Sequence, residues 1–175
     1  VLMNGRPLAL EWEHQNVDAI LETWHLGVQM GTAVANVIFG SANPSGKLSV
    51  SFPRVTGQCP IYYNHPNTGR PGGKSKFTSK YMDIENGPLY PFGFGLSYTE
   101  YTYSNLILER FTDSIRVSVD VQNTGQRPGT EIVQLYVRDI VGSIVRPVLE
   151  MKDYQKVTLL PGEVRTVSFD LPKQK

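Results

Sequence analysis

The sequence lacks several features that would assign it to a common protein class. Cys59 is its single cysteine, so it can form no internal disulfide and no cysteine-based metal cluster. No apolar run approaches the ~20 residues that a membrane-spanning helix needs. The net charge is only +1 and the basic residues are not clustered, so nothing favours a nucleic acid or an anionic membrane as partner. With 40% hydrophobic and 19% charged residues in a chain of 175, the composition is typical of a globular protein.

The stretch from Pro88 to Tyr98 divides the chain into two kinds of sequence. Its two prolines and two glycines exclude a regular helix and a central strand. Large apolar side chains nevertheless lie between them: Leu89, Tyr90, Phe92 and Phe94. We therefore predict a rigid, buried connector at residues 88–100, between a first region at 1–87 and a second at 101–175.

The first region contains signals for both helices and strands. Asn16 is a suitable N-cap for a helix over residues 16–24. A second helix is predicted over residues 30–38, where apolar residues recur on one face, and Gly40 is well placed to end it. Apolar and polar residues alternate over 48–52, which predicts a half-buried strand stopped by Pro53.

The least regular part of the first region is the loop from Asn64 to Lys80. It is rich in glycine, proline and basic residues, and loops of this length are usually functional or disordered. We expect it to be more mobile than the strands around it and to become ordered against another domain or subunit. Tyr63, Arg70 and Lys80 could then contribute to an active-site rim or a subunit contact; the alternative is a disordered surface loop.

The second region alternates with a period of two residues, which is typical of half-buried strands. Turn residues separate the alternating runs, and this spacing indicates an antiparallel β-sandwich. The predicted strands begin near Tyr101, Ile115, Glu131, Gln155 and Val164.

Several motifs follow one another in an order that is hard to obtain by chance. They are Ala19 to Trp24, Ala33 to Gly40, Asn43 to Leu48, Phe52-Pro53 and Pro91 to Tyr98, followed by Asn123 to Gly125, Val133 to Val137 and Arg146-Pro147. The first five resemble glycoside hydrolase family 3, and the last three resemble that family's C-terminal fibronectin type III-like domain. Tyr62 to His65 with Thr68 to Pro71 is most similar to the periplasmic β-glucosidase branch.

The resemblance implies the C-terminal portion of a retaining, exo-acting β-glucosidase or β-xylosidase with three domains. These are a TIM-like barrel, an α/β sandwich and the fibronectin type III-like domain. Residues 1–87 would be the C-terminal part of the α/β sandwich, and residues 101–175 an antiparallel fibronectin type III-like sandwich. One departure is the turn after Trp24, which lacks the proline, the glutamate and one glycine that the family commonly has there.

Retaining glycoside hydrolysis needs two carboxyl groups about 5–5.5 Å apart. The resemblance places the nucleophile on the barrel and the acid/base upstream of the matched segments. The carboxylates present are interpreted as solvated or capping groups: Glu11, Glu13, Glu22, Asp83 and Glu85. We therefore assign no catalytic, substrate-binding or metal-binding residue and expect no cofactor.

The remaining chemistry-bearing side chains also favour structural roles. His14, His25 and His65 have no spacing typical of a metal site and are interpreted as surface histidines. Trp24 could line a sugar subsite, but a buried tryptophan packed against a helix end is favoured.

Two classes of function remain open, and the segment 16–40 discriminates between them. The favoured one is part of a β-glucosidase, periplasmic or secreted, that acts on β-glucosides or oligosaccharides and has no nucleic-acid or membrane partner. Its partners would be the remaining barrel and sandwich segments of the same enzyme, and a homodimer is also considered. The alternative is a stand-alone carbohydrate-binding or adhesion sandwich, which has no use for helices at 16–40.

The sandwich is also expected to lack its final strands, because only five strands can be counted after Tyr101. An open edge would then leave the apolar face of Val117, Val119, Leu135 and Phe169 uncovered and prone to association.

Overall fold

The computed structural model describes residues 1–70, 72 and 77–173 and divides into two compact units. The first unit comprises Val1–Ile38, Lys47–Phe94 and Arg138–Glu150, and the second comprises Phe39–Gly46, Gly95–Val137 and the residues from Met151 onward. Each unit therefore contains a segment that interrupts the other in sequence. The division at residues 88–100 stays a prediction. No helix in the described part of the chain is both long and apolar enough to cross a membrane.

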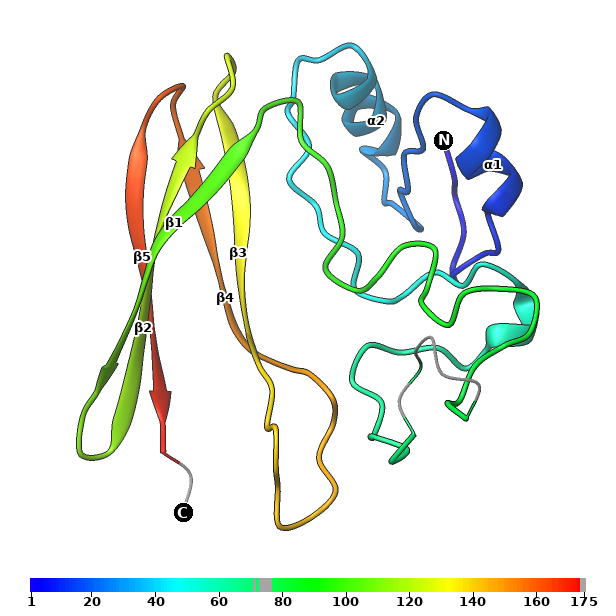
Figure 1. The fold of residues 1–175 in the computed structure, drawn as a ribbon. Coiled ribbons are helices and arrows are strands. Elements are labelled where there is room, and N and C mark those ends of the chain that lie inside the picture. Colours follow the sequence, from blue (N-terminus) through cyan, green and yellow to red (C-terminus); the bar gives the residue numbers. More distant parts are fainter. Residues whose placement is uncertain (71, 73–76, 174–175) are drawn as a thin grey trace. The chain divides into compact units, whose positions relative to one another are not determined.

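The first unit carries the helices, α1 at Glu11–Asn16 and α2 at Met30–Ile38, and a short 3₁₀ turn, η1, at Thr56–Gln58 (Figure 1). Helix α2 confirms the prediction for residues 30–38. Gly40 follows it with φ +76°, the left-handed conformation that ends many helices.

The helix predicted over residues 16–24 is wrong, because Asn16 ends a helix rather than beginning one. Its side-chain nitrogen donates to the Trp12 carbonyl at 2.7 Å, one turn back along α1. Residues 21–23 instead pair with Leu2, whose backbone hydrogen-bonds to Leu21 and Thr23 in a parallel bridge. This pairing across some twenty residues overrides the local helical pattern.

The alternation predicted over residues 48–52 is also wrong. Val50 is exposed, whereas Ser51 and Phe52 are both buried. The backbone of this segment pairs with the connector, where Phe52 N donates to the Tyr90 carbonyl at 2.8 Å. The burial of the polar Ser51 side chain is tolerated because its hydroxyl oxygen accepts a hydrogen bond from Phe92 N at 3.2 Å.

The large apolar side chains of the connector are buried or half-buried only in its first half. Leu89 packs with Leu10 and Phe52 in the core of the first unit. Beyond Pro91 the side chains of Phe94, Leu96 and Tyr98 are exposed, so the prediction of a wholly buried connector holds only as far as Phe92.

The described residues of the second unit form five strands, close to the predicted positions (Figure 1). They are β1 at Tyr101–Arg110, β2 at Ser114–Asn123, β3 at Gly129–Val137, β4 at Glu150–Leu159 and β5 at Val164–Pro172. Strands β1, β2 and β5 form one sheet in that order, with antiparallel pairing on both sides of β2, and β3 pairs with β4 in a second sheet. Strand β4 begins five residues before the predicted Gln155.

The core of the second unit lies between these sheets. Its buried members are Val121, Val133, Val157, Leu159, Val167 and Phe169. Val117 and Phe169 are only 7% and 3% exposed, so the expectation that their face is uncovered is wrong. Val119 and Leu135 are half-buried against the same core. β3 and β4 supply the apolar side chains that exclude water from this face.

Asn123, at the end of β2, is fully buried and has partners on both sides of its amide. The oxygen accepts from the Thr99 hydroxyl at 2.7 Å and from Gly125 N at 3.1 Å. The nitrogen donates to the carbonyls of Arg127 at 2.8 Å and Leu159 at 3.1 Å. One side chain thus joins the start of β1, the β2–β3 turn and the end of β4.

We expect Leu159→Ala to lower the free energy of unfolding by about 2–5 kcal/mol, because it removes a fully buried side chain from this core. Its neighbour Leu160 is 61% exposed, and Leu160→Ala should change stability by no more than about 0.5 kcal/mol. Urea unfolding of both variants measures the difference. Equal effects at the two positions would contradict the assigned core.

Candidate functional site

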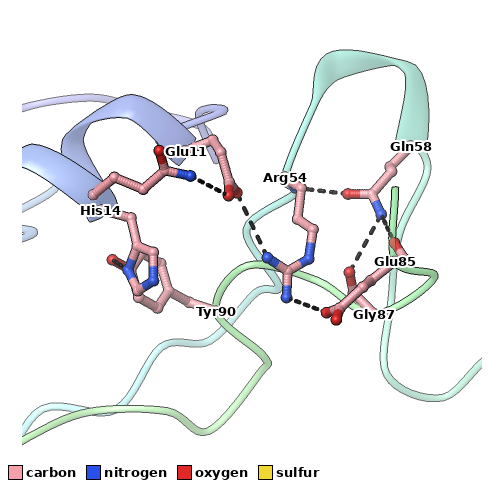
Figure 2. Close-up of polar contacts among 8 residues, drawn as sticks. Glu11, His14, Arg54, Gln58, Glu85, Gly87 and Tyr90 are labelled. Atoms are coloured by element: carbon pink, nitrogen blue, oxygen red, sulfur yellow. Dashed lines mark hydrogen bonds and ion pairs between the residues drawn. The ribbon is translucent and has the colours of Figure 1, made fainter. Parts of the chain in front are cut away.

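Several polar side chains in the described part of the first unit converge on Arg54 (Figure 2). Its guanidinium lies between two carboxylates, 2.8 Å from Glu85 Oε2 through Nη2 and 3.6 Å from Glu11 Oε2 through Nη1. Glu11 begins α1, Arg54 follows the buried Pro53, and Glu85 precedes the connector. Three segments far apart in sequence therefore meet at one cation.

Gln58 completes this cluster from η1, and its side chain is almost wholly buried at 3% exposure. Its oxygen accepts a hydrogen bond from Arg54 N at 2.6 Å. Its nitrogen donates to the carbonyls of Glu85 at 2.9 Å and Gly87 at 3.3 Å (Figure 2). Because the side chain of residue 58 is hydrogen-bonded to residues 85 and 87, the two ends of the long segment 59–84 are held together. We call this segment the 59–84 excursion and its joined ends the neck. We call Glu11, Arg54, Gln58 and Glu85 the neck clamp.

The energy of the neck clamp comes mainly from its buried amide. The Arg54 side chain is 24% exposed and that of Glu85 is 80% exposed, so their ion pair is worth about 0–1 kcal/mol in water. Gln58 in contrast satisfies two carbonyls and one N–H away from solvent, where leaving any of them unpaired is costly.

Tyr90 lies beside the neck clamp in an aromatic environment. Its hydroxyl is 2.9 Å from His14 Nδ1, and its ring stacks on Phe94 with centroids 5.3 Å apart. Burial, and secondly the negative charge of Glu11, raise the pKa of Tyr90 above its ordinary value of 10.0. At neutral pH the phenol is therefore protonated.

The arrangement is suited to positioning rather than to proton transfer. The two carboxylates that meet in it, Glu11 and Glu85, both contact one guanidinium, which has no acceptor and stays charged. A retaining pair would need one carboxylate free to attack carbon and a second to carry a proton. The neck clamp supplies neither a free nucleophilic carboxylate nor a proton-carrying one. Its role is to hold together the ends of the 59–84 excursion.

Of the five candidate carboxylates, only Glu11 and Glu85 come together. Glu22 accepts a hydrogen bond from Trp24 N at 2.8 Å, so it supports a local turn. Glu13 is half-buried on α1 and Asp83 is exposed.

The three histidines are exposed, as predicted for surface histidines. Within the described residues, no three His, Cys, Asp or Glu side chains are grouped so that they could hold a metal ion. Trp24 is half-buried and lies 5.8 Å from Phe52 between ring centroids, so it packs on the core of the first unit. The helix end that it was expected to cover does not exist there.

The loop Asn64 to Lys80, which the sequence leaves open between a functional and a disordered segment, has hydrogen bonds at both ends. At its start, His65 O accepts from Val148 N at 2.9 Å, within the first unit. At its end, Asn86 accepts from Tyr81 N and donates to Ser79 O, at 3.0 and 2.6 Å. The prediction of mobility covers the whole loop, and residues 71 and 73–76 of it lie outside the described residues.

Arg54 and Gln58 were not predicted from the sequence. Neither carries a motif, and apart from the bond between them their partners in the cluster lie 27 to 43 residues away in sequence. A glutamine that ends a short turn was the one available signal, and it is far too common to be selective.

Two family models match the chain. The glycosyl hydrolase family 3 C-terminal domain matches residues 1–98, and a fibronectin type III-like domain matches residues 131–175. The chain is 53% identical to a periplasmic β-glucosidase of Salmonella typhimurium, over 98% of this chain and 23% of the relative. It is 46% identical to a β-xylosidase of Formosa agariphila, over 98% of this chain and 24% of that protein.

A solved structure is similar over almost the whole chain. The β-glucosidase of Listeria innocua in complex with isofagomine superimposes with a TM-score of 0.92 at 43% identity, over 97% of this chain and 25% of that one. The chain thus spans about a quarter of the length of the relatives that it matches.

We expect Gln58→Glu to destabilise the first unit by about 2–4 kcal/mol, because it replaces the donor to two carbonyls with a buried charged oxygen. Gln126→Glu, on an exposed turn, is the matched control and should be near neutral. Denaturant unfolding measures both. A neutral Gln58→Glu would show that the neck clamp contributes nothing.

The stability of the chain should also fall at alkaline pH in a way that depends on Tyr90. In the unfolded chain this phenol loses its proton near its ordinary pKa of 10.0, whereas the folded state keeps the proton to higher pH. Its stabilising contribution is therefore complete below pH ~10 and is lost as the pH rises through the folded-state pKa. Thermal melting from neutral to alkaline pH should fall less steeply for Tyr90→Phe than for the unmodified chain. Parallel curves would contradict this.

Proposed function

Because this chain belongs to glycosyl hydrolase family 3, through that family's C-terminal domain, we propose that it is the C-terminal part of a retaining exo-β-glycosidase that hydrolyses terminal β-D-glucosyl residues. The observation that supports this most is the 53% identity to a periplasmic β-glucosidase over nearly the whole chain. The proposed activity belongs to the whole enzyme.

The nucleophile is proposed to lie on a TIM-like barrel outside these 175 residues, and the acid/base in an earlier part of an α/β sandwich domain. Residues 1–87 would complete that sandwich. This division of labour fits the carboxylates of the first unit, since the two that meet are both held on Arg54. The chain would then contribute structure around an active site and not its reacting groups.

The neck clamp is proposed to present the loop Asn64 to Lys80 at an active-site rim or to a second subunit. Support comes from the fixed ends of that excursion: Gln58 bonds residues 85 and 87, and His65 bonds Val148. A loop whose two ends are held by a scaffold can be positioned accurately. Tyr63, Arg70 and Lys80 remain the side chains proposed to contribute there.

Glucose is favoured over xylose as the released sugar, because the β-glucosidase relative is more similar than the β-xylosidase relative, 53% against 46%. A periplasmic or secreted location is proposed on the same relative. The stand-alone binding module is disfavoured, because α1, α2 and the neck clamp belong to a compact unit separate from the strands, and such a module would not need that unit.

We expect the 175-residue chain alone to show no hydrolysis of an aryl-β-glucoside above buffer, because double displacement cannot begin without its nucleophile. The enzyme expressed from the complete gene should hydrolyse it and release β-glucose first, as followed by proton NMR of the anomers. Turnover by the chain alone, abolished by a substitution within it, would overturn the division of labour. Release of α-glucose by the complete enzyme would overturn the retaining mechanism.

A further inference from the structure

Two asparagine–glycine pairs occur in the chain, Asn4-Gly5 and Asn86-Gly87. In such a pair the glycine nitrogen can attack the preceding side-chain amide, because no β-carbon hinders its approach. Asparagine is for this reason one of the heat-labile residues of proteins. The two pairs lie in the same compact unit but in different surroundings.

The amide of Asn86 is held on both sides. Its oxygen accepts a hydrogen bond from Tyr81 N at 3.0 Å, and its nitrogen donates to Ser79 O at 2.6 Å. Both bonds would have to break for the amide to turn toward the Gly87 nitrogen. This side chain is therefore restrained against reaction.

Asn4 is restrained on one side only. Its nitrogen donates to the Arg6 carbonyl at 2.7 Å, whereas its oxygen is buried and has no hydrogen-bond partner in the described part of the chain. No hydrogen bond to its oxygen therefore restrains the rotation of this amide. Gly5 itself is exposed, so water can reach the site.

A base lies against Gly5. A β-carbon built on this glycine would be 2.9 Å from His25 Nε2 and 3.2 Å from His25 Cδ2. The imidazole is otherwise exposed, so it can exchange protons with solvent. A general base must lie close to the proton that it removes, and here the ring is in contact with the residue whose N–H must be deprotonated.

We propose that Asn4-Gly5 is a site of spontaneous deamidation, with His25 as the proton acceptor. The Gly5 nitrogen gives its proton to His25 and bonds to Asn4 Cγ, and the bond from Cγ to Nδ2 breaks as ammonia leaves with a proton. The resulting five-membered succinimide is opened by water to aspartate or isoaspartate at position 4. One water is consumed and one ammonia released, and no oxidant or reductant is needed.

The test compares the two pairs within one sample. The folded 175-residue chain is incubated at mildly alkaline pH, and the peptides containing positions 4 and 86 are followed by mass spectrometry and by enzymatic methylation of isoaspartate. Product at position 4 should form about tenfold or more faster than at position 86. The two rates should converge in denaturing urea. Equal rates in the folded chain, or a faster reaction at position 86, would overturn the proposal.

The role of His25 is tested by His25→Gln, which should slow the reaction at position 4 by about tenfold. His14→Gln is the matched control, because His14 contacts Tyr90 instead of Gly5. An unchanged rate at position 4 in His25→Gln would overturn the assignment of the proton acceptor. Unfolding of a variant would be detected in the same digest, because it would accelerate the reaction at position 86.

Discussion

A buried side-chain amide must find partners for its oxygen and its nitrogen at the same time, and this requirement shapes both units. In the second unit Asn123 meets it with Thr99, Gly125 and two carbonyls. In the first unit Gln58 meets it with Arg54 N and the carbonyls of two residues beyond the long excursion. Each amide joins segments that no hydrophobic pattern would bring into register, and the surrounding loops can be irregular because these junctions are fixed.

Local patterns predicted the elements whose neighbours in space are also neighbours in sequence. The period-two alternation predicted five strands near their observed starts. The apolar face of residues 30–38, together with Gly40, predicted α2. The failures at residues 16–24 and 48–52 have one physical cause: pairing with a distant backbone. Leu2 and the connector supply hydrogen bonds there that a local pattern does not contain.

The candidate site was predictable only in its parts. Glu11 and Glu85 were interpreted from the sequence as solvated or capping carboxylates, whereas in the structure both contact one guanidinium. The cation that joins them, Arg54, was not predicted, because it lies 31 residues from Glu85 and 43 from Glu11 in the sequence. Charge pairing at such separations depends on the fold, and the family resemblance carried the functional inference instead.

The interleaving of the two units has a consequence for how such proteins can be recombined. Residues 39–46 belong with the strands, and residues 138–150 belong with the helices. A chimera made by a single crossover at the connector would bring in strands without the segment around Asn43, whose side chain bonds Ser97 and Pro128. It would also bring in a 138–150 segment from the other relative, which would have to replace the backbone hydrogen bond from this segment to His65. Exchange between relatives therefore has to transfer three pieces of sequence together.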